Sequence, residues 1–310
     1  VLLDYLPAPA TSITGTNTVC QGQKGITYTT ATITNATSYT WTLPDGSTLT
    51  SATNSITFDM PSTVTSGTMT VVGTNMYGNG IPASIQITVH PLPSVSFTPT
   101  FPRTICQSAA PLLLTDGTPT GGIYTGKGVQ NGVFAPQIAG VGNWTITYVY
   151  TTSNGCTASD SIIMKVVPLP VVTFKESTTK VCIQSSAIPL KGGMPSGGIY
   201  SGKGVENGVF NPTVAGLGAH TLTYFYADSN GCESVDSTTL SVVPMPTVTL
   251  TVPEKNYCTN TPPVTLSGGS PSGGIYSGIG VKNGQFDPSI TGEGSFMVRY
   301  EYMDGNGCSG

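Results

Sequence analysis

Seven cysteines are the residues of this sequence with the most chemistry to offer, and six of them are regularly spaced. The first series, 76 residues apart, is Cys106, Cys182 and Cys258, and the second series, with the same spacing, is Cys156, Cys232 and Cys308. Thiols can pair as disulfides, bind a metal or act as nucleophiles. A metal site needs clustered ligands such as a C-x-x-C pair, and the sequence contains none. The regular pairs therefore predict a disulfide framework.

We predict that each disulfide closes within one 76-residue period, across a separation of 50 residues, as Cys106–Cys156, Cys182–Cys232 and Cys258–Cys308. Closing a loop of that length stabilises a domain by about 4 kcal/mol in the chain-entropy model. Disulfides persist outside the reducing cytoplasm, so the chain is expected to be extracellular. Cys20 is left over, either as a buried free thiol or as a link to another molecule.

An internal repeat surrounds these cysteines. The segment Gly121-Gly122-Ile123-Tyr124-Thr125-Gly126-Lys127-Gly128-Val129 returns at residues 197–205 and 273–281 with few changes. Downstream of it, residues 144–150 alternate large apolar and smaller side chains, which predicts a strand with one buried face. Asn131-Gly132, Asn207-Gly208 and Asn283-Gly284 predict tight hairpin turns. The chain therefore holds three copies of one β-rich unit.

The sequence predicts an all-β fold of tandem immunoglobulin-like β-sandwich domains in an elongated array. The first ninety residues do not follow the repeat, and Trp41 is their natural core aromatic. The expected boundaries are 1–92, 93–169, 170–245 and 246–310, and the last repeat is expected to lack its final strand. Pro-x-Pro elements at 91–93, 168–170 and 244–246 favour stiff joints, so the array should be a semi-rigid rod.

The composition excludes several functional classes. Only 8% of the residues are charged and the net charge is −4, so no basic stripe exists for nucleic acid. No apolar run is long enough to cross a bilayer, so we expect no membrane insertion. The opening Val1-Leu2-Leu3 has neither Met nor a basic segment, which is not an intact signal peptide. Removal of an export signal, or a fragment of a longer chain, would explain this start.

Catalytic and cofactor motifs are weak. The segment 121–128 resembles a phosphate-binding loop, but Gly128 stands where that motif needs Ser or Thr. His90 and His220 lie in different domains, and the acidic residues form no calcium-site ladder. Tyr124, Tyr200 and Tyr276 could stack on a sugar ring, although packing inside the sandwich is favoured. We therefore predict no enzyme activity, no cofactor and no metal site.

The repeat motif resembles the Ig-like repeats of large surface proteins of Bacteroidota. The matching features are Gly-Gly-Ile-Tyr-Ser-Gly-x-Gly-Val-x-Asn-Gly-x-Phe-x-Pro and the later Asn-Gly-Cys, over about residues 93–310. Such proteins are exported by the type IX secretion system and include gliding-motility adhesins of the SprB kind. Residues 12–90 resemble a PKD-like module, with Tyr77 at the position of a second cysteine. The resemblance implies an extracellular adhesin or stalk and carries over no binding residue.

The same resemblance implies O-glycosylation. Bacteroidota glycosylate secreted proteins at Asp-Ser/Thr followed by a small or aliphatic residue. Asp160-Ser161-Ile162 and Asp236-Ser237-Thr238 fit this pattern at equivalent positions. We expect glycans on Ser161 and Ser237, the alternative being two chance matches inherited by duplication.

These observations predict a structural and adhesive surface protein with a surface or glycan ligand, served by cell-surface anchoring and secretion machinery. Two alternatives stay open. One is a carbohydrate-binding appendage of a secreted enzyme. The other is a filament subunit in which Val1 to Leu6 of one copy fills the open edge of the last repeat of another.

Overall fold

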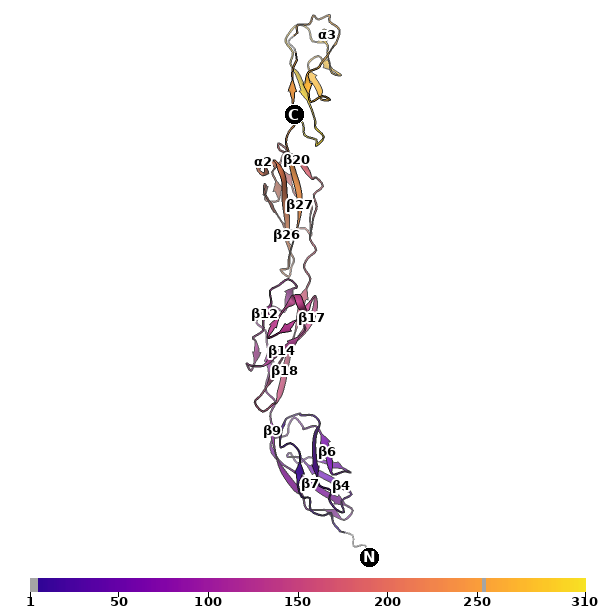
Figure 1. The fold of residues 1–310 in the computed structure, drawn as a ribbon, viewed down its shortest axis with the longest axis vertical. Helices are drawn as coiled ribbons and strands as arrows, with labels where there is room; N and C mark the ends of the chain where they lie inside the picture. The colour runs from indigo at the N-terminus through magenta and orange to yellow at the C-terminus, as the bar shows by residue number, and fades with distance from the viewer. Residues whose placement is uncertain (1–4, 253–254) are drawn as a thin grey trace. The chain divides into compact units, whose positions relative to one another are not determined.

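The computed structural model describes residues 5–252 and 255–310, which are almost entirely strands and loops (Figure 1). The chain divides after Val167 into two compact units. Its helices are single turns, α1 (Pro136–Ala139), α2 (Pro212–Ala215) and α3 (Pro288–Thr291). The predicted all-β class of tandem immunoglobulin-like domains is confirmed. Four of the six residues proposed for strand addition, residues 1–4, lie outside the described residues.

The N-terminal domain is a two-sheet sandwich. Its strands are β1 (Ile13–Thr14), β2 (Thr18–Cys20), β3 (Ile26–Thr30), β4 (Ser38–Thr42), β5 (Thr48–Ser51), β6 (Ser55–Phe58), β7 (Gly67–Asn75), β8 (Gly78–Asn79) and β9 (Ala83–His90). One sheet has the order β1-β3-β6, and the other has the order β2-β9-β7-β4-β5 with β8 on β7. Trp41 is fully buried in the core that these sheets enclose, as predicted.

The first repeat is built from shorter strands around one long hairpin. Its strands are β10 (Ser96–Phe97), β11 (Thr104–Cys106), β12 (Leu112–Leu113), β13 (Gly117–Thr118), β14 (Ile123–Gly126), β15 (Val129–Gln130), β16 (Val133–Phe134), β17 (Gly142–Thr151) and β18 (Thr157–Val167). The main sheet has the order β11-β18-β17-β14, with β11 parallel to β18, and a second sheet has the order β12-β16-β15. β10 pairs with β13.

The second repeat has the same topology. Its strands are β19 (Thr173–Phe174), β20 (Lys180–Cys182), β21 (Ile188–Pro189), β22 (Gly193–Met194), β23 (Ile199–Gly202), β24 (Val205–Glu206), β25 (Val209–Phe210), β26 (Gly218–Ala227) and β27 (Glu233–Val243). β20 again runs parallel to the last strand, in the order β20-β27-β26-β23. The 76-residue sequence period therefore corresponds to one structural unit.

The third repeat has a more open sheet. Its strands are β28 (Thr249–Leu250), β29 (Val264–Thr265), β30 (Gly269–Ser270), β31 (Ile275–Gly278), β32 (Val281–Lys282), β33 (Gln285–Phe286) and β34 (Val298–Glu301). Among the described residues β34 pairs only with β31, whereas its equivalents β17 and β26 have partners on both sides. Met297, beside β34, is 87% exposed.

The hairpins follow from the sequence patterns. In β17 the buried residues Ile146 and Tyr148 alternate with more accessible ones, so the period-two pattern marks the inner face as predicted. Asn131 and Gly132 both have positive φ, at 50° and 75°, between β15 and β16. Asparagine and glycine tolerate that backbone region best, which is why this pair closes a two-residue turn. Asn207-Gly208 and Asn283-Gly284 repeat the geometry.

One tyrosine explains the Gly-Gly pair of the motif. The buried hydroxyl of Tyr148 accepts a hydrogen bond from the Gly122 N–H at 2.7 Å and donates one to the carbonyl oxygen of Pro119. A Cβ on Gly122 would overlap the Tyr148 ring, so only glycine fits there. Tyr224 and Tyr300 make the equivalent bonds in the other repeats. The glycines therefore seat a core tyrosine.

Candidate functional site: the disulfide-linked domain junctions

The first junction begins with the strand that carries Cys20. β2 lies parallel to β9, and their register places Cys20 opposite His90, the last residue of β9. The chain then leaves the N-terminal domain through Pro91-Leu92-Pro93. Cys20 is therefore held at the end of the domain from which the next domain starts.

The second partner lies at the tip of the long β17–β18 hairpin. The Gly155 N–H donates to the Thr152 carbonyl at 2.9 Å, and the Thr152 N–H donates to the Cys156 carbonyl at 2.9 Å. Gly155 has a φ of +81°, which glycine adopts at little cost. The Cys156 N–H also donates to the Thr152 hydroxyl at 3.1 Å. These bonds fix a rigid tip that presents the nearly fully buried Cys156.

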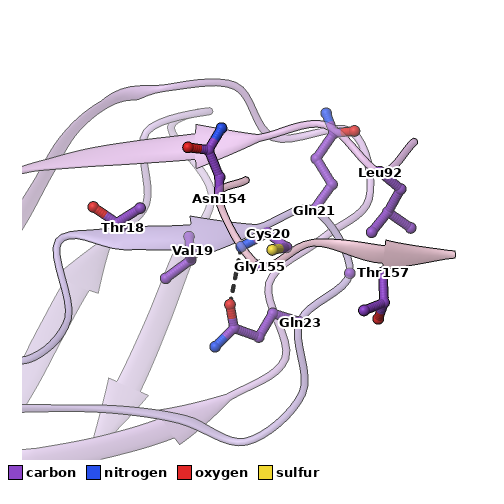
Figure 2. A pocket seen from close by; sticks show the side chains of 10 residues that line it. Thr18, Val19, Cys20, Gln21, Gln23, Leu92, Asn154, Gly155 and Thr157 are labelled. Atoms are coloured by element: carbon purple, nitrogen blue, oxygen red, sulfur yellow. Dashed lines mark hydrogen bonds between the residues drawn. The ribbon is translucent and has the colours of Figure 1, made fainter. Parts of the chain in front are cut away.

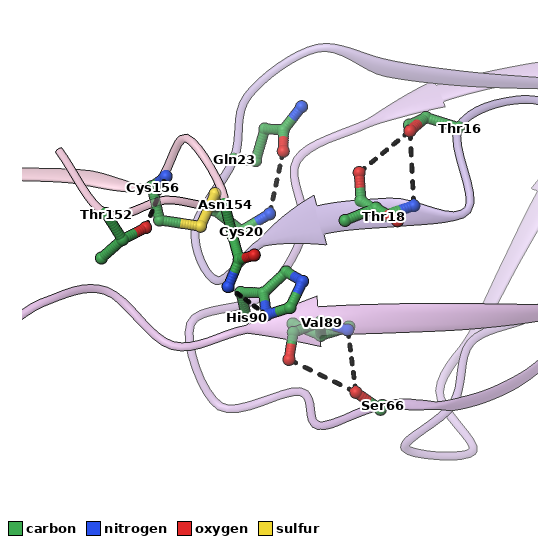
Figure 3. The surroundings of a disulfide bond; sticks show 10 residues. All are labelled: Thr16, Thr18, Cys20, Gln23, Ser66, Val89, His90, Thr152, Asn154 and Cys156. Carbon is green, nitrogen blue, oxygen red and sulfur yellow. Dashed lines mark hydrogen bonds between the residues drawn. A yellow bond between two sulfur atoms is a disulfide. The ribbon is translucent and has the colours of Figure 1, made fainter.

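Cys20 and Cys156 form a disulfide with a Cα–Cα distance of 5.6 Å, within the usual range for such bonds (Figure 3). Beside it, Asn154 Nδ2 and His90 Nδ1 lie 3.2 Å apart, in a hydrogen bond between the two domains. The bond links the strand of one domain to the hairpin tip of the next. We call this arrangement an interdomain staple.

A second interdomain staple lies in the second unit. Cys182, at the end of β20, bonds to Cys308, with a Cα–Cα distance of 5.7 Å. Cys308 follows Asn306-Gly307, the equivalents of Asn154-Gly155. The Lys180 ammonium donates to Asn306 Oδ1 at 3.3 Å, so the tip asparagine again contacts the preceding domain. Cys106 and Cys232 are also disulfide-bonded, while Cys258 is a free and exposed thiol.

The predicted pairing within each period is therefore wrong. Cys156 bonds to Cys20 and not to Cys106; Cys308 bonds to Cys182, which excludes Cys182–Cys232 and Cys258–Cys308. The prediction of Cys20 as a free thiol is also wrong.

Strand geometry explains why the predicted pairing fails. Cys106 lies opposite Val167, at the far end of β18, whereas Cys156 directly precedes Thr157, its first residue. A strand of 11 residues spans about 35 Å. The two cysteines thus flank opposite ends of one strand, far beyond the roughly 7 Å that a disulfide can bridge. The odd number of cysteines was the one sequence signal for a pairing that shifts by one domain.

The hairpin tips of the three repeats differ at one position, which is titratable in the second and third repeats. Asp228 and Asp304 replace Thr152, and their Oδ1 atoms accept the N–H of Cys232 and Cys308 at 2.9 Å. Those backbone bonds are the largest cause that lowers the pKa of both carboxyls below 3.8. Because the folded pKa lies below the unfolded one, this stabilisation is present above the ordinary value and is lost as pH falls through the folded pKa.

We therefore expect the Cys232 and Cys308 amide resonances to titrate below pH 3.8, as the aspartates become protonated. The Cys156 amide is the internal control, because its acceptor is a hydroxyl that does not titrate. Amide chemical shifts followed by NMR from neutral to acid pH measure both. In Asp228→Thr the Cys232 titration should vanish. A titration midpoint of the Cys232 amide at or above 3.8 would contradict the assignment.

A shallow pocket of about 400 Å³ lies beside the first staple (Figure 2). Its lining is uncharged and includes the side chains of Gln21, Gln23, Asn154 and Thr157. Gln23 Oε1 accepts the Cys20 N–H at 2.9 Å, which orients this side chain. The pocket therefore offers amide and hydroxyl groups to a neutral polar ligand.

The tyrosines considered for sugar stacking pack inside the repeats. The Tyr124 ring centroid lies 4.6 Å from that of Tyr148, and its hydroxyl accepts the Gly117 N–H at 2.6 Å. Tyr200 and Tyr276 repeat these contacts. The predicted packing role is confirmed.

The other residues singled out in the sequence have structural partners. His220 is buried, with Nε2 2.8 Å from the Gly216 carbonyl. Lys127, from the loop that resembles a phosphate-binding motif, lies over the Trp144 ring at 3.9 Å. Among residues 5–252 and 255–310, no three His, Cys, Asp or Glu side chains are grouped to hold a metal ion. No helix in this described part of the chain is long and apolar enough to span a membrane.

Ser161 and Ser237 are exposed on β18 and β27, where they lie opposite Thr147 and Thr223. The aspartate before each serine has a structural role. Asp160 Oδ2 accepts the Phe97 N–H at 2.8 Å, and Asp236 Oδ2 accepts the Phe174 N–H at 2.7 Å. Backbone bonds from Phe97 and Ser161 lower the pKa of Asp160. The serines are accessible to modification, which stays a prediction.

Comparison with known proteins finds one family match and several distant structural similarities. Residues 6–87 match the PKD-like domain family. The chain is similar in structure to a Ca²⁺-stabilized adhesin with which an Antarctic bacterium binds ice, at 13% identity over 99% of this chain and 97% of that one, with a TM-score of 0.35. It is also similar to hemolin, an insect immune protein, at 13% identity over 96% of both chains and a TM-score of 0.23.

A third similar structure is a Bacteroides ovatus protein, SGBP-B of a mixed-linkage glucan utilization locus, in complex with a heptasaccharide. The identity is 12% over 86% of this chain and 73% of that one, with a TM-score of 0.20. Identities this low concern the fold alone. No protein of curated function matches the sequence.

Proposed function

We propose that this chain is a non-catalytic, load-bearing stalk and adhesive region of a large extracellular surface protein. Its modules would be a PKD-like domain (1–92) and Ig-like repeats at 93–169, 170–245 and 246–310. The surface protein would be an adhesin of a Bacteroidota cell, exported by the type IX secretion system and held by cell-surface anchoring machinery. Its role would be in gliding motility. The resemblance of the repeat motif supports these finer assignments.

The interdomain staples are the observation that carries this proposal. Each one joins consecutive domains by a second covalent connection, beside the proline-rich linker. A protein that only needs independent folded domains gains little from such a connection, whereas one that transmits force between domains gains a joint that cannot be drawn apart. Disulfides of this kind form and persist in an oxidising, extracellular environment.

The ligand we favour is a glycan or a glycan-coated surface. The pocket beside the first staple presents amide groups of Gln21 and Asn154 and the hydroxyl of Thr157, without a charged side chain. Sugar hydroxyls both donate and accept hydrogen bonds, which amide side chains match with their paired donor and acceptor. A carbohydrate-binding appendage of a secreted enzyme would use the same chemistry and is the second candidate.

Beads coated with the chain and flowed over glycan-coated and bare surfaces test the proposal. We expect the beads to be retained under shear and the glycans to remain uncleaved. Asn154→Ala should weaken retention on glycans, whereas the equivalent Asn230→Ala in the second repeat is the matched control and should not. Retention on no surface would refute an adhesive role, and release of reducing sugar would indicate an enzyme.

We also expect native material to carry O-glycans on Ser161 and Ser237. Intact-mass and peptide mass spectrometry should then find excess mass on the peptides that contain them. Ser161→Ala should remove the excess from the first peptide and leave the second unchanged. Unmodified masses on both peptides would remove this prediction and leave the aspartates with their structural role alone.

A further inference from the structure

Cys258 is the one cysteine whose thiol is free in the described part of the chain. We propose that it is a covalent docking site for the cysteine at an Asn-Gly-Cys hairpin tip of another repeat of this type. The inference deepens the proposed stalk function, because it assigns a further junction and the chemistry of its partner.

Cys258 occupies a repeat position whose equivalents bond to a hairpin tip. Cys258 lies 76 residues after Cys182, which bonds to the hairpin tip of the following repeat. Cys20, which has the same place in the N-terminal domain, also bonds to the hairpin tip of the following domain. Both described staples thus join this strand-end position to an Asn-Gly-Cys tip, and in neither is the partner within the same domain.

The backbone turn after Cys258 also matches its bonded equivalents. The Cys182 carbonyl accepts the Ser185 N–H at 3.0 Å, and the Cys20 carbonyl accepts the Gln23 N–H at 3.2 Å. The Cys258 carbonyl accepts the Thr261 N–H at 2.9 Å, which is the same turn. The turn that follows Cys258 is therefore the turn of its bonded equivalents, although residues 255–258 form no strand, and the Cys258 side chain is exposed where theirs are covered by a partner.

Neighbouring polar groups define the partner further. Two residues before Cys182, Lys180 contacts the tip asparagine Asn306. Asn256 holds that position before Cys258 and is exposed. It can pair with the tip asparagine of an incoming repeat through an amide–amide hydrogen bond, with a donor and an acceptor on each side chain. The occupant that fits is thus the Asn-Gly-Cys tip of a hairpin and not a small thiol.

Bond formation requires an oxidant, which we take to be a disulfide compound such as glutathione disulfide. The Cys258 thiolate attacks it, forming a mixed disulfide and releasing one glutathione thiolate. The tip thiolate then attacks the Cys258 sulfur of the mixed disulfide and displaces the second glutathione. Two cysteine thiols lose two electrons and two protons in total, and one glutathione disulfide becomes two glutathione thiols.

A chain extended by one repeat tests this proposal. Gly310 holds the repeat position of Ser234, so a second copy of residues 235–310 placed directly after it continues the repeat in register. After refolding in a glutathione redox buffer, peptide mapping without reduction should find Cys258 linked to the appended copy of Cys308. The single alkylatable thiol should then be the appended copy of Cys258.

The control is Cys258→Ser in the extended chain, which should leave two alkylatable thiols, in the appended copies of Cys308 and Cys258. The Cys20–Cys156 and Cys182–Cys308 peptides in the same map show that each extended chain has folded. The proposal is overturned if Cys258 stays alkylatable, or if the appended copies of Cys258 and Cys308 pair with each other. Either result would leave the bead-retention measurement on the 310-residue chain unaffected, so the two proposals fail separately.

Discussion

Pulled at its two ends with its disulfides intact, the chain should extend by far less than its length allows. The shortest covalent path runs through residues 1–20, across the first staple to 156–182, and across the second to 308–310. The residues between each pair of bonded cysteines carry no tension, so the unfolding of their domains adds no length to the chain. Single-molecule force spectroscopy on the oxidised chain should therefore show no unfolding step of the length of a domain.

Reduction of the disulfides should release the contour length that the two staples bypass. At roughly 3.6 Å per residue, the first staple hides about 490 Å across its sequence separation of 136, and the second about 450 Å across 126. In a reducing buffer, unfolding steps should appear and the full contour length should be reached. Cys20→Ser combined with Cys156→Ser is the selective control and should release part of the first length while the second staple still holds. Domain-sized steps in the fully oxidised chain would contradict the covalent path.

The second large effect concerns stability. Trp41→Ala should lower the free energy of unfolding of the N-terminal domain by about 4 kcal/mol, since it leaves a cavity in a fully buried position. Single domains are commonly stable by about 5–15 kcal/mol, so much of the margin would be lost. Urea unfolding followed by circular dichroism measures the change, and Trp144 fluorescence reports the first repeat separately in the same variant.

Trp144→Ala is the matched control, because the chain has only two tryptophans. Trp144 is half-buried; its Nε1 donates to the Gly140 carbonyl at 2.7 Å, and Lys127 covers its ring. We expect this change to destabilise the first repeat by only about 1–2 kcal/mol, from one hydrogen bond and one cation–π contact. If Trp41→Ala lowers the free energy of unfolding by no more than Trp144→Ala does, the N-terminal core does not depend on its central aromatic.

The local patterns of the sequence were sufficient to predict the sandwich elements. Alternation around Tyr148 identified the inner face of β17, and Asn131-Gly132 identified a turn with two positive φ values, because each pattern reflects a local backbone or burial constraint. The residue after Lys127 was the reason to predict no phosphate-binding role for residues 121–128, and the Lys127 ammonium lies over the Trp144 ring.

Cysteine pairing could not be predicted in the same way. A partner 50 residues away and a partner 126 residues away are equally regular in a chain with a 76-residue period. The choice depends on which end of a long strand each cysteine occupies. That is set by the parallel pairing of β11 with β18, a contact between distant segments with no sequence signature. The pocket beside the first staple depends on the Cys20–Cys156 bond and could not be predicted either.

The staples also bear on resistance to proteolysis. A single backbone cut anywhere between residues 20 and 156, or between 182 and 308, leaves both fragments joined through sulfur. A protease encountered outside the cell would nick such a chain without shortening it. A reductant is then needed to part the fragments of a chain that has been cut within either loop.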